Sequence, residues 1–171
     1  MKINELKKVL KDSTKEDLIK DIVDLFKKNN FVKDYYGSKY NTDNTLSILN
    51  KHKDIIKNEF FPQRGDGKAR LSVAKKAITE FKKISQDKAL VADLMIFYVE
   101  MGVEFTNSYG DINESFYLSM EGMFEQAVKF IISNDIDKLF RERCEEIVHN
   151  TDGIGWGFHD GLSAIYYDYF L

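Results

Sequence analysis

Apolar residues recur three and four positions apart along almost the whole chain, and this helical spacing is the feature that most restricts the fold. An alternating apolar and polar pattern never runs long enough to indicate a β-strand. The sequence therefore predicts an all-α protein with seven or eight antiparallel helices joined by short turns. We expect the helices to stack as hairpins, in a bundle or in a short α–α superhelical array of the HEAT or TPR kind. No repeat of fixed length is visible, so a regular solenoid is not predicted.

Capping and breaking residues mark the helix ends in the first part of the chain. Ser13 stands three residues before Glu16, which is the spacing of a capping box and predicts the start of a second helix. That helix is expected to weaken at residues 29–30. An aromatic turn over residues 31–36 and a polar connection over residues 37–44 are predicted to follow.

The only proline, Pro62, predicts a helix end, because the residue before a proline is pushed out of the α region. A helix over residues 46–61 should stop there, and another is predicted over residues 71–84. Asp87 is a suitable cap for the next helix, whose residues 90–105 are the least polar stretch of the chain. Because apolar residues occur all round this helix, we expect it to be buried centrally.

The charge of the chain is divided unevenly along its length. Residues 1–88 hold 21 Lys and Arg against 13 Asp and Glu, whereas residues 89–171 hold 4 against 15. The net charge of −3 therefore hides a basic half and an acidic half. The two halves would pair either with each other or with charged partners, and the sequence leaves both alternatives open.

Length and composition indicate one soluble helical domain over residues 1–171, as a monomer or a homodimer. No stretch approaches the roughly 18 apolar residues of a membrane span, and the first residues lack an apolar signal region, so we expect a cytoplasmic protein without membrane contact. The single cysteine, Cys144, excludes an internal disulfide. The glutamates that follow it would raise the pKa of its thiol, which favours an unreactive cysteine.

Four segments together resemble a known family, and they span nearly the whole chain. They cover residues 59–62, 68–78, 103–113 and 153–160. These segments are similar to those of an uncharacterised family of small bacterial all-helical proteins that is catalogued as a domain of unknown function. The resemblance implies a bacterial cytosolic helical protein, and it implies no activity, cofactor or catalytic residue.

A glycine-containing loop before the helix at residues 71–84 is a candidate anion site. Two glycines would let backbone N–H groups converge near the helix start, with Arg64, Lys68 and Arg70 completing a phosphate or carboxylate site. The spacing does not match a phosphate-binding loop and no strand precedes it. We therefore favour a solvated turn over anion binding.

Glu146 and His149 are a weak candidate for metal binding. Their i, i+3 spacing places a carboxylate and an imidazole on one helical face, as in half of a di-iron site. His52 and His159 lack an acidic residue three positions before them, so no second half is present. A surface ion pair is the favoured interpretation, and neither a metal nor any other cofactor is predicted.

Two pairs of glutamates would meet if neighbouring helices packed face to face. Glu100 and Glu104 lie one turn apart, as do Glu121 and Glu125 on the next predicted helix. Converging carboxylates would bind a cation or raise one another's pKa. We favour the alternative, in which these acidic residues pair with lysines of the preceding helix, namely Lys75, Lys76, Lys82 and Lys83.

The segment 153–161 combines four glycines with the only tryptophan. Glycines allow close backbone approach, so Trp156 and Phe158 are predicted to anchor the turn as a buried aromatic plug, with Tyr109 as a third aromatic candidate. The alternative is catalytic: His159 and Asp160 would act as a base and its partner. They would work together with Tyr109 or Asp111 across a cleft.

Three classes of function are compatible with these features. We favour a binding or scaffold module that holds a protein or peptide on a concave helical face. A small metal-dependent or acid–base enzyme would need Glu104, Asp111, His159 and Asp160 in one pocket. A nucleic-acid binder would use lysines on solvent faces of the first helices and is disfavoured by a pI of about 5.7.

Overall fold

The computed structural model describes residues 1–170, without the side chains of residues 42 and 43. This part of the chain contains nine α-helices and no strand, which confirms the all-α prediction with one or two helices more than expected. The helices are α1 (Ile3–Lys11), α2 (Lys15–Lys28), α3 (Asn30–Tyr40), α4 (Thr42–Phe60), α5 (Leu71–Ile84), α6 (Lys88–Tyr109), α7 (Glu114–Ser133), α8 (Asp137–His149) and α9 (Phe158–Phe170).

The additional helix is α3, which occupies the stretch predicted as an aromatic turn and part of the predicted polar connection. Asn29 both ends α2 and begins α3, because its side-chain oxygen accepts hydrogen bonds from the backbone N–H groups of Phe31 and Val32. An asparagine that breaks one helix can therefore cap the next without a loop between them. The predicted turn and connection were wrong for this reason.

The cap of α2 is also shifted by one residue from its prediction. Thr14, not Ser13, is the cap, and its hydroxyl oxygen accepts from the backbone N–H of Asp17 at 3.1 Å. The predicted end of α4 before Pro62, the span of α5 and the cap at Asp87 are confirmed.

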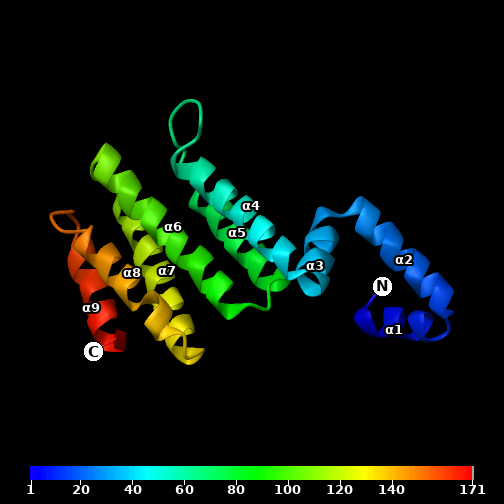
Figure 1. Ribbon diagram of the computed structural model, residues 1–171. Coiled ribbons are helices and arrows are strands. Elements are labelled where there is room, and N and C mark those ends of the chain that lie inside the picture. Colours follow the sequence, from blue (N-terminus) through cyan, green and yellow to red (C-terminus); the bar gives the residue numbers. More distant parts are fainter. Residues whose placement is uncertain (171) are drawn as a thin grey trace.

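The helices from α4 to α9 form three hairpins, α4–α5, α6–α7 and α8–α9, that stack side by side (Figure 1). We call these helices the body. Helix α6 packs against α4 and α5 on one side and against α7 and α8 on the other, which confirms its predicted central position. At Gly102 an added Cβ would lie 2.2 Å from the sulfur of Met120, so α6 and α7 approach closely where this residue has no side chain.

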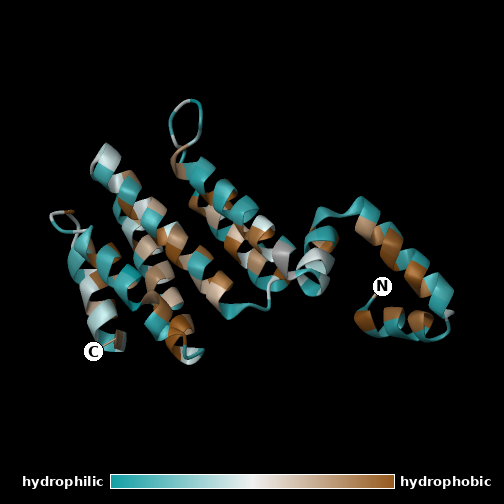
Figure 2. Cartoon of the chain, viewed as in Figure 1, coloured by the Kyte–Doolittle hydropathy of each residue, from teal (hydrophilic) through white to brown (hydrophobic). Residues whose placement is uncertain are grey.

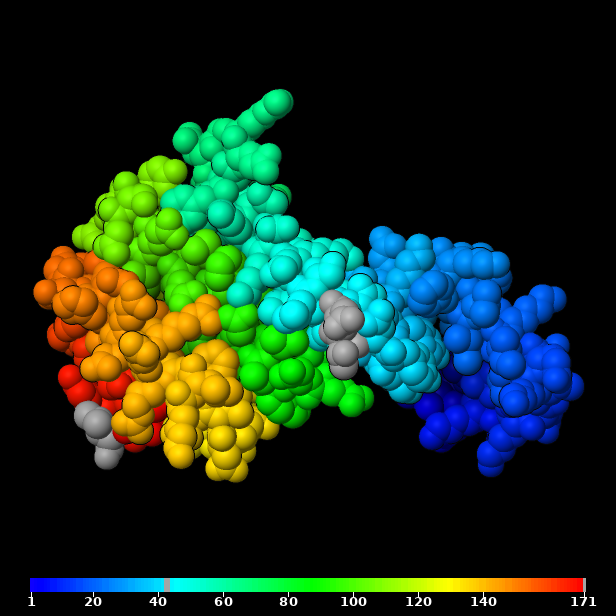
Figure 3. All heavy atoms as spheres, in the orientation of Figure 1, coloured from blue at the N-terminus to red at the C-terminus, as the bar shows by residue number. Residues whose placement is uncertain are grey.

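The helices α1 and α2, residues 3–28, extend away from the body and are joined to it through α3 (Figures 1 and 3). We call them the arm. Neither arm helix contains a buried residue, and neither contributes to the hydrophobic core, which is built from residues of α4 to α9. The body therefore has a core of its own, and the arm packs on the rest of the chain chiefly through contacts between α2 and α3.

Candidate functional site

The most unusual surface of the molecule is the apolar face of the arm. Both arm helices are amphipathic, and Figure 2 shows hydrophobic residues along the two of them, clear of the body. Nine large apolar side chains on these helices are exposed, with exposed fractions between 37% and 73%. The face consists of these nine and the half-buried Leu18: Ile3, Leu6, Val9, Leu10, Leu18, Ile19, Ile22, Val23, Leu25 and Phe26.

The exposed area of this face is large for an isolated protein. The nine exposed fractions together equal more than four fully exposed residues, which for large apolar side chains amounts to several hundred Å². Contiguous apolar patches beyond a few hundred Å² on monomeric proteins usually mark interaction sites. The local sequence explains why the arm still forms helices, because Thr14 caps α2 and acidic residues open the first turn of each arm helix.

The apolar stripe of α2 follows from helical spacing alone, and such a stripe ordinarily faces the core. Stripes of the same kind on α5 are buried in the body. Helical spacing is identical in the two cases, so no signal in the periodicity separates a covered stripe from an exposed one.

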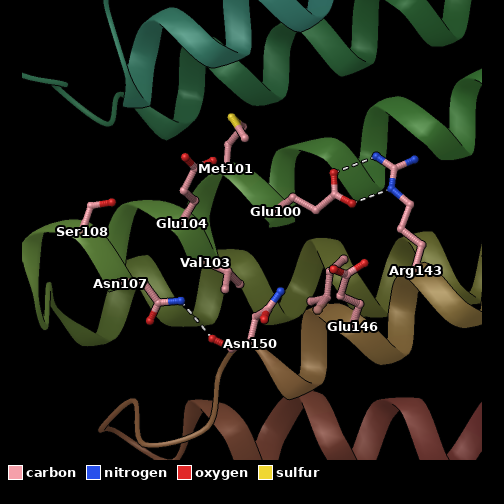
Figure 4. A pocket seen from close by; sticks show the side chains of 10 residues that line it. Glu100, Met101, Val103, Glu104, Asn107, Ser108, Arg143, Glu146 and Asn150 are labelled. Carbon is pink, nitrogen blue, oxygen red and sulfur yellow. Dashed lines mark hydrogen bonds and ion pairs between the residues drawn. The ribbon is translucent and has the colours of Figure 1, made fainter.

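A second candidate surface is the groove between α6 and α8, with a cavity volume of about 500 Å³ (Figure 4). Its lining includes the carboxylates Glu100, Glu104 and Glu146, and Asn107 donates a hydrogen bond to the backbone oxygen of Asn150 across one end. At the other end Arg143 reaches Glu100 from α8 (Figure 4).

Arg143 is the centre of an ion-pair network that joins three helices. Its guanidinium donates to both carboxylate oxygens of Glu100, with Nη2 2.7 Å from Oε2, and to Asp93. Asp93 also pairs with Lys53 of α4 at 2.6 Å. Burial disfavours the charged guanidinium, but the hydrogen bonds that it donates to the carboxylates of Glu100 and Asp93 outweigh burial and raise the pKa of Arg143. Because its cation is already paired, the groove offers Glu104 and Glu146 rather than Arg143 to a ligand.

The groove between α8 and α9 has a volume of about 610 Å³ and is lined by Glu142, Glu145, Glu146, His149 and His159. The ring of His159 lies with Nδ1 3.2 Å from the backbone oxygen of Val148 and 3.1 Å from the hydroxyl of Thr151. In the described part of the chain, no set of three or more histidine, cysteine or acidic side chains is arranged to hold a metal ion. Glu146 and His149, the weak metal candidates, thus share a groove without forming such a set.

The catalytic candidates are not brought together. Glu104 lines the groove on one side of α8 and His159 the groove on the other side. Asp111 lies before α7, where one carboxylate oxygen accepts a hydrogen bond from the buried hydroxyl of Tyr117. Asp160 is exposed on α9. The single pocket that an enzyme would need is therefore not formed by these residues.

The three cations of the candidate anion site lie in different environments. Arg70 is bound to the carboxylate of Glu59, with Nε 2.8 Å from Oε2 and Nη2 2.7 Å from Oε1. Arg64 and Lys68 are exposed. A Cβ on Gly67 would lie 1.9 Å from the backbone oxygen of Phe60, so packing against backbone accounts for this glycine. Arg70 is therefore already paired with Glu59 and is not free to join Arg64 and Lys68 in the candidate anion site, for which the sequence analysis had favoured a solvated turn.

The predicted aromatic plug is half correct. Phe158 is fully buried, with its ring centroid 4.8 Å from that of Tyr117, but Trp156 is 63% exposed. The prediction that Trp156 is buried was wrong, because Phe158 fills the core position and Trp156 instead borders a small cavity beside Glu121. Tyr109, the third aromatic candidate, is exposed at the C-terminal end of α6, where its ring stacks on Phe61 and lies tilted against Phe105.

The predicted glutamate pairs do not face each other. Glu100 turns to Arg143, Glu121 borders the cavity near Trp156, and Glu125 pairs with Lys129 of its own helix. The favoured pairing with lysines of α5 was also wrong: Lys75 donates to Ser119, Lys76 pairs with Glu80 and Lys82 lies over the ring of Phe130. Lys75, Lys76 and Lys82 thus contact a hydroxyl, a carboxylate of their own helix and an aromatic ring instead.

Cys144 is buried and free. Burial, more than its charged neighbours, raises the pKa of its thiol to about 12. The predicted direction of this shift is confirmed, although its main cause is desolvation.

Comparison with known proteins identifies a family whose description names no activity. Within residues 1–170, none of the helices combines the length and the apolar character that crossing a membrane takes. No curated protein and no solved structure matches the chain. A family model described as a family of unknown function (DUF6155) matches residues 1–170, and the chain belongs to this family.

Proposed function

We propose that this protein is a helical protein-binding module whose binding surface is the apolar face of the arm. The observation that carries the proposal is the exposure of this face on two helices that the core of the body does not require. A partner that removes this apolar area from water stabilises the complex by about 25 cal/mol per Å² buried. A partner of matching chemistry presents an amphipathic helix, because apolar side chains at helical spacing complement each other.

The charges of the arm disfavour nucleic acid as the partner. Residues 3–28 contain seven lysines but also six acidic residues, which are interspersed with the lysines. A phosphate backbone would meet these carboxylates as well as the lysines. We place the function in the bacterial cytoplasm, as the family resemblance implies and as a chain without disulfides favours.

The proposal is tested by protein capture with two matched variants of the full chain. Ile22→Gln with Leu25→Gln makes the apolar face polar, whereas Lys8→Gln with Lys11→Gln introduces glutamine at two exposed positions on the polar face of α1. Partners retained by the wild-type chain should be lost by the first variant and kept by the second, as quantified by mass spectrometry of the captured proteins. Equal capture by both variants would contradict the proposal.

Both variants should have the melting temperature of the wild-type body, because neither arm helix contributes to the core. This measurement separates a lost binding surface from a lost fold.

A further inference from the structure

Most of the apolar positions of α2 are arranged symmetrically about Ile22. Reversal about this residue exchanges Leu18 with Phe26. It likewise exchanges Ile19 with Leu25, and Ile22 falls on itself. All five belong to the apolar face of the arm. An antiparallel second copy of α2 would therefore set apolar residues against apolar residues along the helix.

The charged ends of α2 have the complementary arrangement. Glu16 and Asp17 lie in its first turn, and Lys27 and Lys28 lie in its last turn. The same reversal exchanges the acidic pair with the basic pair. In an antiparallel pair of helices the acidic first turn of one copy lies level with the basic last turn of the other, at both ends. A parallel pair would bring like charges together at each end.

One position of α2 departs from this relationship. Asp21 exchanges with Val23, so these two are not matched in character. The remaining exchanges leave no carboxylate opposite a carboxylate and no lysine opposite a lysine.

We infer that the partner of the arm is the arm of a second copy of this chain, with the two α2 helices antiparallel about a two-fold axis at Ile22. This inference rests on the proposed function and names the occupant of its surface. The interface is isologous, since the same face is used twice. With α1 of each copy beside it, the pair of arms forms a four-helix arrangement.

The area of the face agrees with this occupant. Each copy presents several hundred Å² of apolar surface on its arm, which is of the same order as the about 800 Å² per partner that standard stable interfaces bury. A lipid surface fits less well, because amphipathic helices that bind anionic lipids carry a polar face rich in lysine and arginine. The polar face of α2 mixes Lys20 and Lys27 with Asp17 and Asp24.

The first test is the mass of the full chain in solution. Sedimentation velocity between about 1 and 200 µM should show a dimer that dissociates on dilution. Ile22→Gln with Leu25→Gln should weaken the dimer at least tenfold, and Lys8→Gln with Lys11→Gln should leave it within about threefold of wild type. A dimer that is insensitive to the first variant would overturn the inference.

Single cysteine substitutions test the direction of pairing. Under mild oxidation Ile22→Cys should form a disulfide-linked dimer, because the two residues meet on the axis. Leu18→Cys should not cross-link, because antiparallel copies separate the two residues by about 12 Å along the helix, beyond the roughly 7 Å Cα separation that a disulfide spans. Cross-linking through Leu18→Cys would show a parallel pair and overturn the inference. The buried Cys144 should stay out of both reactions.

A chain that stays monomeric at every concentration also overturns the self-pairing. The capture comparison with the same two variants then decides the proposed function separately. In that case binding of the wild-type chain, but not of Ile22→Gln with Leu25→Gln, to vesicles of phosphatidylserine and phosphatidylcholine would identify lipid as the occupant.

Discussion

The guanidinium of Arg143 on α8 holds the carboxylate of Glu100 on α6 through two parallel hydrogen bonds, although 43 positions separate them in the chain. The same guanidinium reaches Asp93, which also pairs with Lys53 of α4. A planar guanidinium suits this arrangement because it presents several N–H groups in a fixed plane. The pair therefore fixes the third hairpin of the body against the central helix.

Replacing Arg143 by methionine is expected to destabilise the body by about 1–3 kcal/mol, because Glu100 would be left partly buried without a partner. Chemical denaturation followed by circular dichroism measures this change. The double variant with Glu100→Gln should lose less than the sum of the two single variants, since the unpaired carboxylate is then removed. Additive losses would show that the two side chains do not interact.

Phe158 and Trp156 should differ sharply in their effect on stability. Phe158→Ala is expected to cost about 3–5 kcal/mol, because it removes a fully buried ring and leaves a cavity beside Tyr117. Trp156→Ala should cost less than about 1 kcal/mol, since most of this ring is in water. Thermal unfolding of both variants measures the difference, and equal losses would contradict the observed burial.

Acid stability should depend on Glu59. The hydrogen bond from the Arg70 side chain lowers the pKa of Glu59 from its ordinary value of about 4.5. Because the folded chain then binds a proton less readily than the unfolded chain, the bridge stabilises the fold above about pH 4.5. This stabilisation is lost as the pH falls through the lowered pKa of the folded state.

Melting temperatures between about pH 7 and pH 3 measure this dependence. Glu59→Gln should melt lower than wild type at neutral pH and approach it in acid, because the variant has no carboxylate to protonate at this position. Arg70→Gln should flatten the profile in the same way. Parallel profiles for the wild type and Glu59→Gln would contradict the assignment.

The charge division of the sequence has only a small structural role within the chain. Among the ion pairs of the described residues, Lys53 with Asp93 joins the basic half to the acidic half. The other pairs lie within one half, as with Arg70 and Glu59 or Arg143 and Glu100. A long-range excess of charge predicts the sign of the surface, but individual partners depend on which side chains the packing brings within reach.

Local sequence signals were sufficient to predict most helices of the body and the centre of the core. Pro62 and Asp87 fix helix boundaries through backbone geometry and capping, which act over a few neighbouring residues. Residues 90–105 are apolar all round, and a helix of that composition is stable only inside the protein. Asn29 shows the limit of such local signals, since the same residue ends one helix and begins the next.

Which apolar stripe is covered and which side chains meet depend instead on the packing of the whole chain. Helical spacing shows that residues such as Ile22 and Leu25 share a face, but it does not show which element packs against that face. The contact between Arg143 and Glu100 and the exposure of Trp156 likewise depend on how hairpins distant in sequence stack. Burial is a property of the whole packing arrangement, because a side chain leaves water only when another element occupies the space beside it.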